Sequence, residues 1–333
     1  MALRRWKRLF SWPRYRRCRR VFRHPLLAHI HLSGVHRRTF RLAFRHGGAL
    51  RFSRSSWRQL WSFLLADEAR ADSLRAAAGC IEFNHEGLVI ALRPEPADFA
   101  VFQEIFLDDV YAIAALPPTL GTVVDLGANI GLFSLRLAAR ARRILAVEPI
   151  AANRAMAARQ FATNGVAQRL ALRGEAMGAS SGRPVRLWHS PAGGATHSCL
   201  ASVARVSGAG AWEEIPAISL PDLLDREGIT RVDLLKCDME GAEYGVLLST
   251  SPEVLGRIAR IVLEAHVTPE IPAASLERLR AHLRRASFEL EERPLAAVGP
   301  VQPCLIRAHR APPAASPPGQ ERRAERDAGY EPE

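Results

Sequence analysis

The stretch that decides the fold is Val123-Val124-Asp125-Leu126-Gly127-Ala128-Asn129-Ile130-Gly131. A mostly apolar strand leads into two glycines in a G-x-x-x-G spacing, and a helical pattern follows from Leu132. A strand that turns through glycines into a helix lets the backbone approach a ligand closely, beside the positive end of the helix. The stretch therefore predicts a nucleotide-like cofactor site at the end of a strand.

Two acids near this turn indicate which cofactor it suits. Dinucleotide-binding enzymes use G-x-G-x-x-G here and place a pyrophosphate at the start of the helix. A carboxylate at Asp125 would repel a pyrophosphate, but it suits the cationic amino-acid end of S-adenosylmethionine, directly or through water. Glu148 ends the next predicted strand, where an acid can accept hydrogen bonds from both ribose hydroxyls. Together the two acids favour S-adenosylmethionine over an ordinary glycine turn with an Asp cap.

Strand and helix patterns alternate from Thr119 onward, which is typical of a doubly wound parallel sheet. The predicted strands are 123–126, 144–147, 170–174, 232–237 and 258–265. The predicted helices are 132–143, an alanine-rich helix that ends at Asn164, and 277–285. An antiparallel pair, 288–291 with 304–308, closes the pattern. An insertion at 180–220 is predicted to hold a hairpin of 185–188 and 214–218.

Candidate chemical residues follow two later strands, at the edge where open α/β sheets bind ligands. Asp238 and Glu240 come after the strand that contains Lys236, which is one of only two lysines in the chain. The two acids suit either acid–base chemistry or ligation of a cation, and we assign no metal-ligand set. His266 follows the next strand, and histidine is the usual proton acceptor near neutral pH. A purely structural role for His266 is equally open.

Positive charge concentrates at the N-terminus. Residues 1–66 contain 17 Arg and Lys and no Asp or Glu, whereas the remaining residues hold 29 bases and 34 acids. Such an arm suits an anionic lipid surface, a nucleic acid or an acidic glycan, or it is solvated without a partner. Within this region the patterns predict a hairpin of 39–45 and 49–52, a helix over 57–78 and a β-element over 81–92. A helix is predicted over 98–113.

Cysteine usage and hydropathy bear on the compartment. Five cysteines are scattered without a C-x-x-C pair, which argues against a disulfide framework or a zinc site. No secretory signal pattern is visible, and no apolar run reaches the ~18 residues that would span a bilayer. The sequence therefore predicts a cytoplasmic protein, with peripheral attachment to a membrane as an open alternative.

Four segments together resemble the FkbM family of S-adenosylmethionine-dependent methyltransferases. They are V-V-D-L-G-A-N-I-G-L-F-S from Val123, A-V-E-P from Ala146, D-L-L-K-C-D-M-E-G-A-E-Y from Asp233 and L-E-A-H from Leu263. The resemblance covers about residues 98–310 and includes Asp109 and Tyr111 in its lead-in. It implies a Rossmann-like class I methyltransferase fold, an α/β fold with a mostly parallel seven-stranded sheet and a terminal antiparallel pair. The small basic α+β region precedes this fold.

The resemblance implies O-methylation of a hydroxylated small molecule or glycan, with S-adenosyl-L-methionine as the methyl donor. It assigns cofactor contacts to Asp125, Gly127, Ala128, Asn129, Gly131, Glu148, Glu175 and Ala176. It assigns the chemical face to Lys236, Asp238, Glu240 and His266. We expect direct in-line transfer, with Asp238 or His266 accepting the hydroxyl proton. Gly178-Ala179-Ser180 departs from the family, which commonly has an acid soon after the third strand.

Two other functions stay open. The Arg- and aromatic-rich arm would suit an RNA methyltransferase, although Asp238-Met239-Glu240 stands where amine-methylating enzymes carry Asn/Asp-Pro-Pro-Tyr/Phe. Alternatively, the chain could be a non-catalytic membrane-surface or scaffold protein. The expected organisation is a basic region over 1–97, a methyltransferase domain over 98–310 and a disordered tail over 311–333. The sequence does not indicate an oligomeric state.

Overall fold

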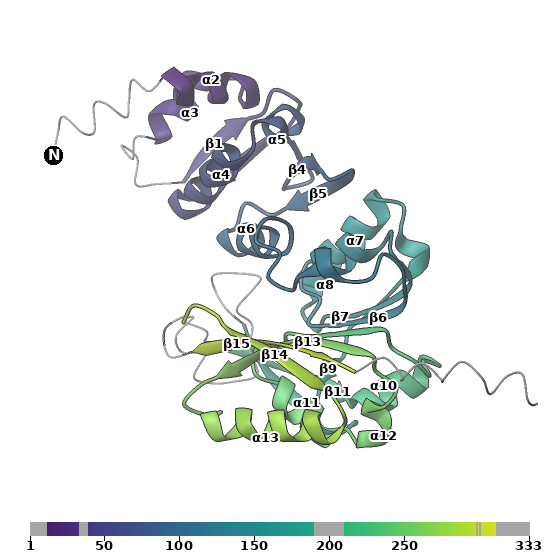
Figure 1. Cartoon of the computed structure of the whole chain (residues 1–333). Helices are drawn as coiled ribbons and strands as arrows, with labels where there is room; N and C mark the ends of the chain where they lie inside the picture. The colour runs from purple at the N-terminus through teal and green to yellow at the C-terminus, as the bar shows by residue number, and fades with distance from the viewer. Residues whose placement is uncertain (1–11, 33–38, 190–209, 298, 300, 311–333) are drawn as a thin grey trace, which may run out of the picture.

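A seven-stranded sheet in the order β14-β15-β13-β12-β6-β7-β8 forms the centre of the fold (Figure 1). Neighbouring strands are parallel except where β15 pairs with β13 and with β14. This confirms the predicted Rossmann-like α/β fold with its antiparallel pair at one edge. The strands are β6 (Leu120–Leu126), β7 (Ala141–Val147), β8 (Leu170–Arg173), β12 (Leu234–Cys237), β13 (Arg260–Val267), β14 (Glu289–Pro294) and β15 (Gln302–His309).

The computed structural model describes residues 12–32, 39–189, 210–297, 299 and 301–310. Parts of the sequence predictions fall outside these ranges: residues 1–11 and 33–38 of the basic region, residues 190–209 of the insertion and the tail predicted to be disordered. Among the described residues, no helix combines the length and the apolar character needed to cross a bilayer.

Two apolar cores cover the two faces of the central sheet. Val123, Ile144 and Leu234 belong to the core under α7 (Leu132–Leu137) and α8 (Ala151–Thr163). The adjacent residues Val124, Leu145 and Leu235 belong to the opposite core. Successive side chains of a strand point to opposite faces, so strands buried on both faces need continuous apolar runs. The helices over this second core are α10 (Leu220–Arg226), α11 (Glu243–Ser249), α12 (Pro252–Leu255) and α13 (Ala273–Arg285).

The helix predicted over 132–143 is wrong beyond its first half. Helix α7 ends at Leu137, and β7 begins at Ala141, which pairs with Leu120 of β6. The Arg140 side chain donates hydrogen bonds to the carbonyl oxygens of Ile113 and Pro117, at 2.8 and 2.7 Å. These long-range contacts override the helix propensity of an alanine- and arginine-rich segment.

Two further predicted helices are broken for related reasons. The helix predicted over 57–78 is α4 (Arg54–Ala66) and α5 (Glu68–Ser73), followed by strand β3 (Arg75–Ala77). The helix predicted over 98–113 is α6 (Pro96–Phe102) and a π-helix, η1 (Gln103–Leu107). It stops before Asp109, which has a φ of 44° and whose carboxylate accepts hydrogen bonds from the backbone of the next turn. Apolar residues keep a helical spacing in both segments, but the backbone does not keep helical hydrogen bonds. After α5 it pairs as strand β3 with β4, and after η1 it bonds to the Asp109 carboxylate.

The N-terminal region is built from a helical pair and two small sheets (Figure 1). Helices α2 (Trp12–Val21) and α3 (Pro25–Leu32) precede the hairpin of β1 (Phe40–Ala43) and β2 (Ala49–Phe52), which confirms the predicted pair. The predicted β-element is a hairpin of β4 (Cys80–His85) and β5 (Leu88–Leu92), which β3 extends.

Side-chain amides of α8 attach this region to the central sheet. Gln160 accepts a hydrogen bond from the Ala91 backbone N–H at 3.0 Å and donates to the Ala91 carbonyl at 2.8 Å. Asn164 makes the same two bonds with Val89, both at 2.8 Å. The two amides therefore satisfy the edge of β5 in the place of a further strand.

The predicted hairpin of the insertion is also confirmed. Strands β10 (Pro184–His189) and β11 (Ala211–Ile218) pair antiparallel. The short strand β9 (Ala176–Met177) pairs in parallel with the end of β11, which brings the insertion beside the C-terminal ends of β7 and β8.

Replacement of Gln160 should weaken the attachment of the N-terminal region to α8. In Gln160→Ala the Ala91 N–H and carbonyl lose their partners in a buried place, so we expect about 2–4 kcal/mol of lost stability. Urea unfolding followed by circular dichroism measures it. The control is Gln168→Ala, an exposed glutamine whose side chain donates a hydrogen bond to the nearby Gly165 carbonyl, and it should change stability by less than about 0.5 kcal/mol. Equal effects of the two substitutions would contradict the assignment.

Candidate functional site

The turn after β6 approaches the end of β12 so closely that only glycine fits. Gly127 has a φ of +77°, and a Cβ placed on it would lie 1.8 Å from the Asp238 carbonyl oxygen. Gly131 has a φ of +81°, and its Cβ would lie 2.8 Å from Ala157 of α8. The G-x-x-x-G spacing therefore serves two close approaches, one to a neighbouring strand end and one to a helix.

Asp125 lies beneath this turn, fully buried. Its Oδ2 accepts a hydrogen bond from the Ser134 hydroxyl at 2.7 Å, and its Oδ1 is 3.6 Å from the Lys236 Nζ. Burial raises the pKa of Asp125 above its ordinary value, against the attraction of Lys236. Asp125 is not among the residues that line the cavity described below, so it supports the turn from within.

Lys236 connects the same two strand ends. Its Nζ donates a hydrogen bond to the Gly127 carbonyl at 2.8 Å and is 3.4 Å from Asp238 Oδ2. The rings of Tyr111 and Phe133 lie within 6.0 Å of the ammonium group. Burial lowers the pKa of Lys236, but the carboxylates of Asp238 and Asp125 outweigh burial and hold it above its ordinary value. The lysine is therefore a fixed cation.

Glu148 closes the turn from the end of β7. Its two carboxylate oxygens accept hydrogen bonds from the backbone N–H groups of Asn129 and Ile150, at 2.8 and 2.9 Å. Burial raises its pKa to about 7, although both backbone bonds favour the ionised form. Glu148 and Asn129 both face the cavity.

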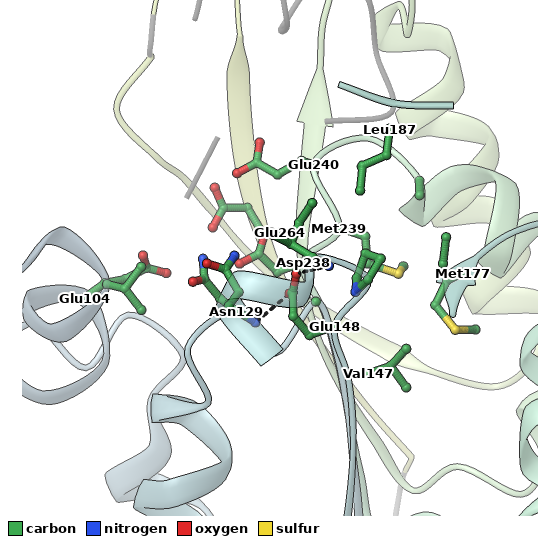
Figure 2. A pocket seen from close by; sticks show the side chains of 17 residues that line it. Glu104, Asn129, Val147, Glu148, Met177, Leu187, Asp238, Met239, Glu240 and Glu264 are labelled. Atoms are coloured by element: carbon green, nitrogen blue, oxygen red, sulfur yellow. Dashed lines mark hydrogen bonds between the residues drawn. The ribbon is translucent and has the colours of Figure 1, made fainter. Parts of the chain in front are cut away.

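The cavity lies over the C-terminal ends of β6, β7, β12 and β13 and encloses about 840 Å³, including the part open to solvent. Figure 2 shows apolar side chains on one side of it, among them Val147, Met177 and Leu187. Carboxylates gather on the other side, and these are Glu104, Asp238, Glu240 and Glu264. Asn129 lies between Glu104 and Asp238, and Glu148 lies beside Asp238 near the centre of the view (Figure 2).

The structure brings half of the sequence-predicted site residues to the wall of this cavity. The lining includes Gly127, Asn129, Glu148, Ala176, Asp238 and Glu240. The other predicted residues, Asp125, Ala128, Gly131, Glu175, Lys236 and His266, are not part of it. The Glu175 carboxylate forms an ion pair with Arg226. The roles of all these residues in binding or catalysis stay predictions.

Asp238 is held by two buried neighbours. The Tyr111 hydroxyl donates a hydrogen bond to Asp238 Oδ2 at 2.9 Å, beside the contact with Lys236. Burial raises the pKa of Asp238, but Lys236 and His266 with the tyrosine hydrogen bond bring it below its ordinary value. Asp238 is therefore ionised and poorly basic.

His266 is enclosed by carboxylates rather than open to the cavity. Its Nδ1 is 3.0 Å from Glu243 Oε1, and its Nε2 is 3.4 Å from Glu264 and 3.7 Å from Glu240. Burial lowers the pKa of His266, but these carboxylates together raise it well above the ordinary value. Glu243 in turn accepts hydrogen bonds from the backbone of Met239 and Gly241. At neutral pH the imidazole of His266 is therefore the doubly protonated cation, and its positive charge balances the surrounding carboxylates.

Like Glu148, the lining acids Glu240 and Glu104 have pKa values raised to near neutral pH. Burial, reinforced by Asp238 and Glu264, raises the pKa of Glu240 to about 8, against the attraction of His266. Burial and the same two carboxylates raise the pKa of Glu104 to about 7. The sequence prediction did not include Glu104, because it lies on the π-helix η1, far from any motif.

Two overlapping sets of these groups have the spacing of cation ligands, but the set that includes His266 can bind a metal ion only when the imidazole has lost its proton. The donor atoms of Asp238, Glu240 and His266 lie within 4.8 Å of one another, and so do those of Glu104, Asp238 and Glu264. Oxygen-rich sets of this kind suit hard divalent ions. They suit an organic cation equally, because the described carboxylates outnumber Lys236 and His266.

Residues 125–290 match the model of the methyltransferase FkbM domain. The chain belongs to the FkbM methyltransferase family. The matched residues include every strand end that lines the cavity, together with the hairpin of the insertion.

Two curated proteins are similar to this FkbM-family chain. One is the AMB antimetabolite synthetase AmbE of Pseudomonas aeruginosa, 33% identical over 234 residues, which are 58% of this chain and 11% of AmbE. The other is methyltransferase sdnD of Sordaria araneosa, 29% identical over 236 residues, which are 63% of this chain and 89% of sdnD.

Among solved structures, the methyltransferase FkbM of Methylobacillus flagellatus KT is similar at 16% identity with a TM-score of 0.40. The match covers 59% of this chain and 45% of that chain. The FkbM-family chain therefore spans less than half of that protein and about a tenth of AmbE.

Removal of the Lys236 charge should destabilise the fold. Lys236→Met leaves Asp125 and Asp238 side by side without their shared cation, so we expect a loss of about 3–5 kcal/mol in urea unfolding. Without Lys236 the folded-state pKa values of Asp125 and Asp238 rise, so both carboxylates take up protons more readily as the pH falls. The loss of stability should therefore be smaller near pH 5 than near pH 8.

The double variant Lys236→Met/Asp238→Asn provides the control. It should regain part of the lost stability, because one of the two uncompensated charges is gone. If the double variant were less stable than Lys236→Met by the full cost of Asp238→Asn alone, the proposed charge coupling would be refuted.

Proposed function

We propose that this protein transfers a methyl group from S-adenosyl-L-methionine to a hydroxyl of a small-molecule or glycan acceptor. The observation that supports the proposal is the cavity itself, with an apolar half beside Glu148 and a carboxylate half at the ends of β12 and β13. A site of this kind suits a ligand with an aromatic base at one end and positive charge toward the other.

The residues present fit this methyl donor. Glu148 stands at the end of β7, where a carboxylate can accept hydrogen bonds from ribose hydroxyls. Val147, Met177 and Leu187 offer an apolar wall for a base. Asp125 Oδ1 is buried beneath the turn, 3.6 Å from the Lys236 Nζ, and has no hydrogen-bond partner among the described residues. When bound, S-adenosylmethionine supplies a methyl group already activated by a sulfonium.

Given an activated donor, the remaining work of the chain is alignment, exclusion of water and removal of one proton. We propose Glu240 as the group that accepts the hydroxyl proton. It lines the cavity, and its pKa of about 8 makes it a stronger base than an ordinary carboxylate. Asp238 is held ionised by Lys236 and Tyr111, and His266 is already protonated, so these two suit positioning and charge balance.

The relatives support a biosynthetic small molecule as the acceptor class. AmbE is a synthetase of an antimetabolite, and sdnD is a methyltransferase of similar length to the matched region. A small acceptor also fits the cavity, whose acidic half lies between η1 and the ends of β12 and β13.

Calorimetric titration with S-adenosylmethionine and S-adenosylhomocysteine tests the donor. We expect both to bind, and Glu148→Ala to weaken binding at least about tenfold, because a charged hydrogen-bond acceptor is worth ~1.5–3 kcal/mol. Asp225→Ala is the matched control, since Asp225 is an exposed carboxylate paired with Arg257. Absence of binding to folded protein would refute the donor, and equal affinities of both variants would refute the role of Glu148.

Glu240→Gln tests the base, with radiolabelled S-adenosylmethionine and a panel of hydroxylated acceptors. We expect kcat/KM of the wild type to rise with pH toward a plateau above about 8, because only the ionised form accepts a proton. The substitution should lower kcat/KM ~10²–10⁴-fold and abolish the rise. Glu291→Gln, an exposed carboxylate on β14, should change neither. Full activity of Glu240→Gln with an unchanged pH profile would exclude Glu240 as the base.

A further inference from the structure

The helical pair α2–α3 exposes large apolar side chains beside cations. Trp12 is 61% exposed, Leu26 is 61% exposed and Leu27 is 43% exposed. Among the side chains whose burial the structure describes, Leu107 and Trp212 are the other large apolar ones exposed by more than a third. The first three share one short segment, and single exposed apolar residues elsewhere are ordinary in proteins.

The cations of this segment surround a surface depression that Trp12 also lines. The depression is formed by Trp12, Pro13, Arg16, Arg17, Arg19, Arg20 and Arg45. The face of α2 that points away from this depression sets the orientation of the helix, because Cys18, Val21 and the following Phe22 are buried in the core. The arginines therefore remain at the surface while the apolar face of the helix is used for folding.

Little negative charge offsets these arginines. The chain has no Asp or Glu before Asp67. One ion pair of α2 joins Arg20 to Asp72 at 3.9 Å, with both side chains at least half exposed. Such a pair is weak in water, so the surface keeps a net positive charge.

We propose that the surface formed by α2 and α3 docks on an anionic phospholipid bilayer. Arginines pair with lipid phosphates, and Trp12, Leu26 and Leu27 can enter the boundary between headgroups and acyl chains. Tryptophan is enriched at that boundary. Exposed leucines favour a lipid surface over nucleic acid, because an aliphatic side chain neither stacks on bases nor bonds phosphates.

The position of the pair makes docking compatible with an accessible cavity. Figure 1 shows α2 and α3 at one end of the molecule and α12 and α13 at the other, with the strands of the central sheet between them. No described residue of α2 or α3 lines the cavity, so docking through this pair does not occupy it. The inference does not depend on methyl transfer and can be tested without a methyl donor.

Cosedimentation of the full chain with vesicles tests the proposal. We expect binding to phosphatidylcholine vesicles that contain about a quarter phosphatidylglycerol and much weaker binding to pure phosphatidylcholine. Arg16→Gln/Arg19→Gln should lower the partition coefficient about fivefold for each arginine removed. Leu26→Ser/Leu27→Ser should lower it about tenfold or more, because both apolar side chains leave the lipid.

Matched control variants test whether vesicle binding depends on the surface of α2 and α3 or only on the number of exposed arginines and apolar side chains in the chain. Arg284→Gln/Arg285→Gln removes two exposed arginines from α13, and Trp212→Ser removes an exposed tryptophan from β11. Both should bind the anionic vesicles as the wild type does. Thermal unfolding checks that every variant is folded before binding is compared.

Three results would overturn the proposal. The first is no preference for the anionic vesicles, and the second is wild-type binding by folded Leu26→Ser/Leu27→Ser. The third is tighter binding to single-stranded RNA than to the vesicles, lost in the arginine variant and kept in the leucine variant, which would assign the surface to nucleic acid.

Discussion

One buried ammonium group holds the two strand ends from which the cavity is built. Lys236 on β12 donates to the Gly127 carbonyl after β6 and lies between the carboxylates of Asp125 and Asp238. A buried charge must be paired, and here one cation compensates two acids on different strands. The glycine turn, the position of Asp238 and the approach of Glu148 through Asn129 all depend on this arrangement.

Around that centre, burial decides which acidic groups can exchange a proton. Asp238 has a cation and a tyrosine hydroxyl beside it and stays ionised. Glu240 and Glu104 have mainly other carboxylates as neighbours, so burial and repulsion raise their pKa values toward neutrality. Similar side chains at one edge of a sheet thus acquire different roles, and a pKa near the working pH is what proton transfer in catalysis requires.

The segment that leads from the N-terminal region into the central sheet contributes to the cavity, and the N-terminal region itself carries a separate surface. Tyr111 and Glu104 come from the segment between α6 and β6, and both lie beside Asp238. The N-terminal region docks on α8 through Gln160 and Asn164, so its helical pair is held at a distance from the strand ends. Attachment through α8 therefore serves both the cavity and the exposed basic surface.

The amino-acid sequence by itself determined the parallel sheet, its antiparallel ending and the acids at Asp125, Glu148 and Asp238, because apolar runs and strand-end motifs are local patterns. Only the tertiary structure decided that His266 is enclosed by carboxylates and that Glu240 and Glu104 face the cavity. It also decided that the helix after Gly131 stops at Leu137. Burial, charge coupling and long-range hydrogen bonds such as those of Arg140 join residues far apart in the chain, and no local pattern records such contacts.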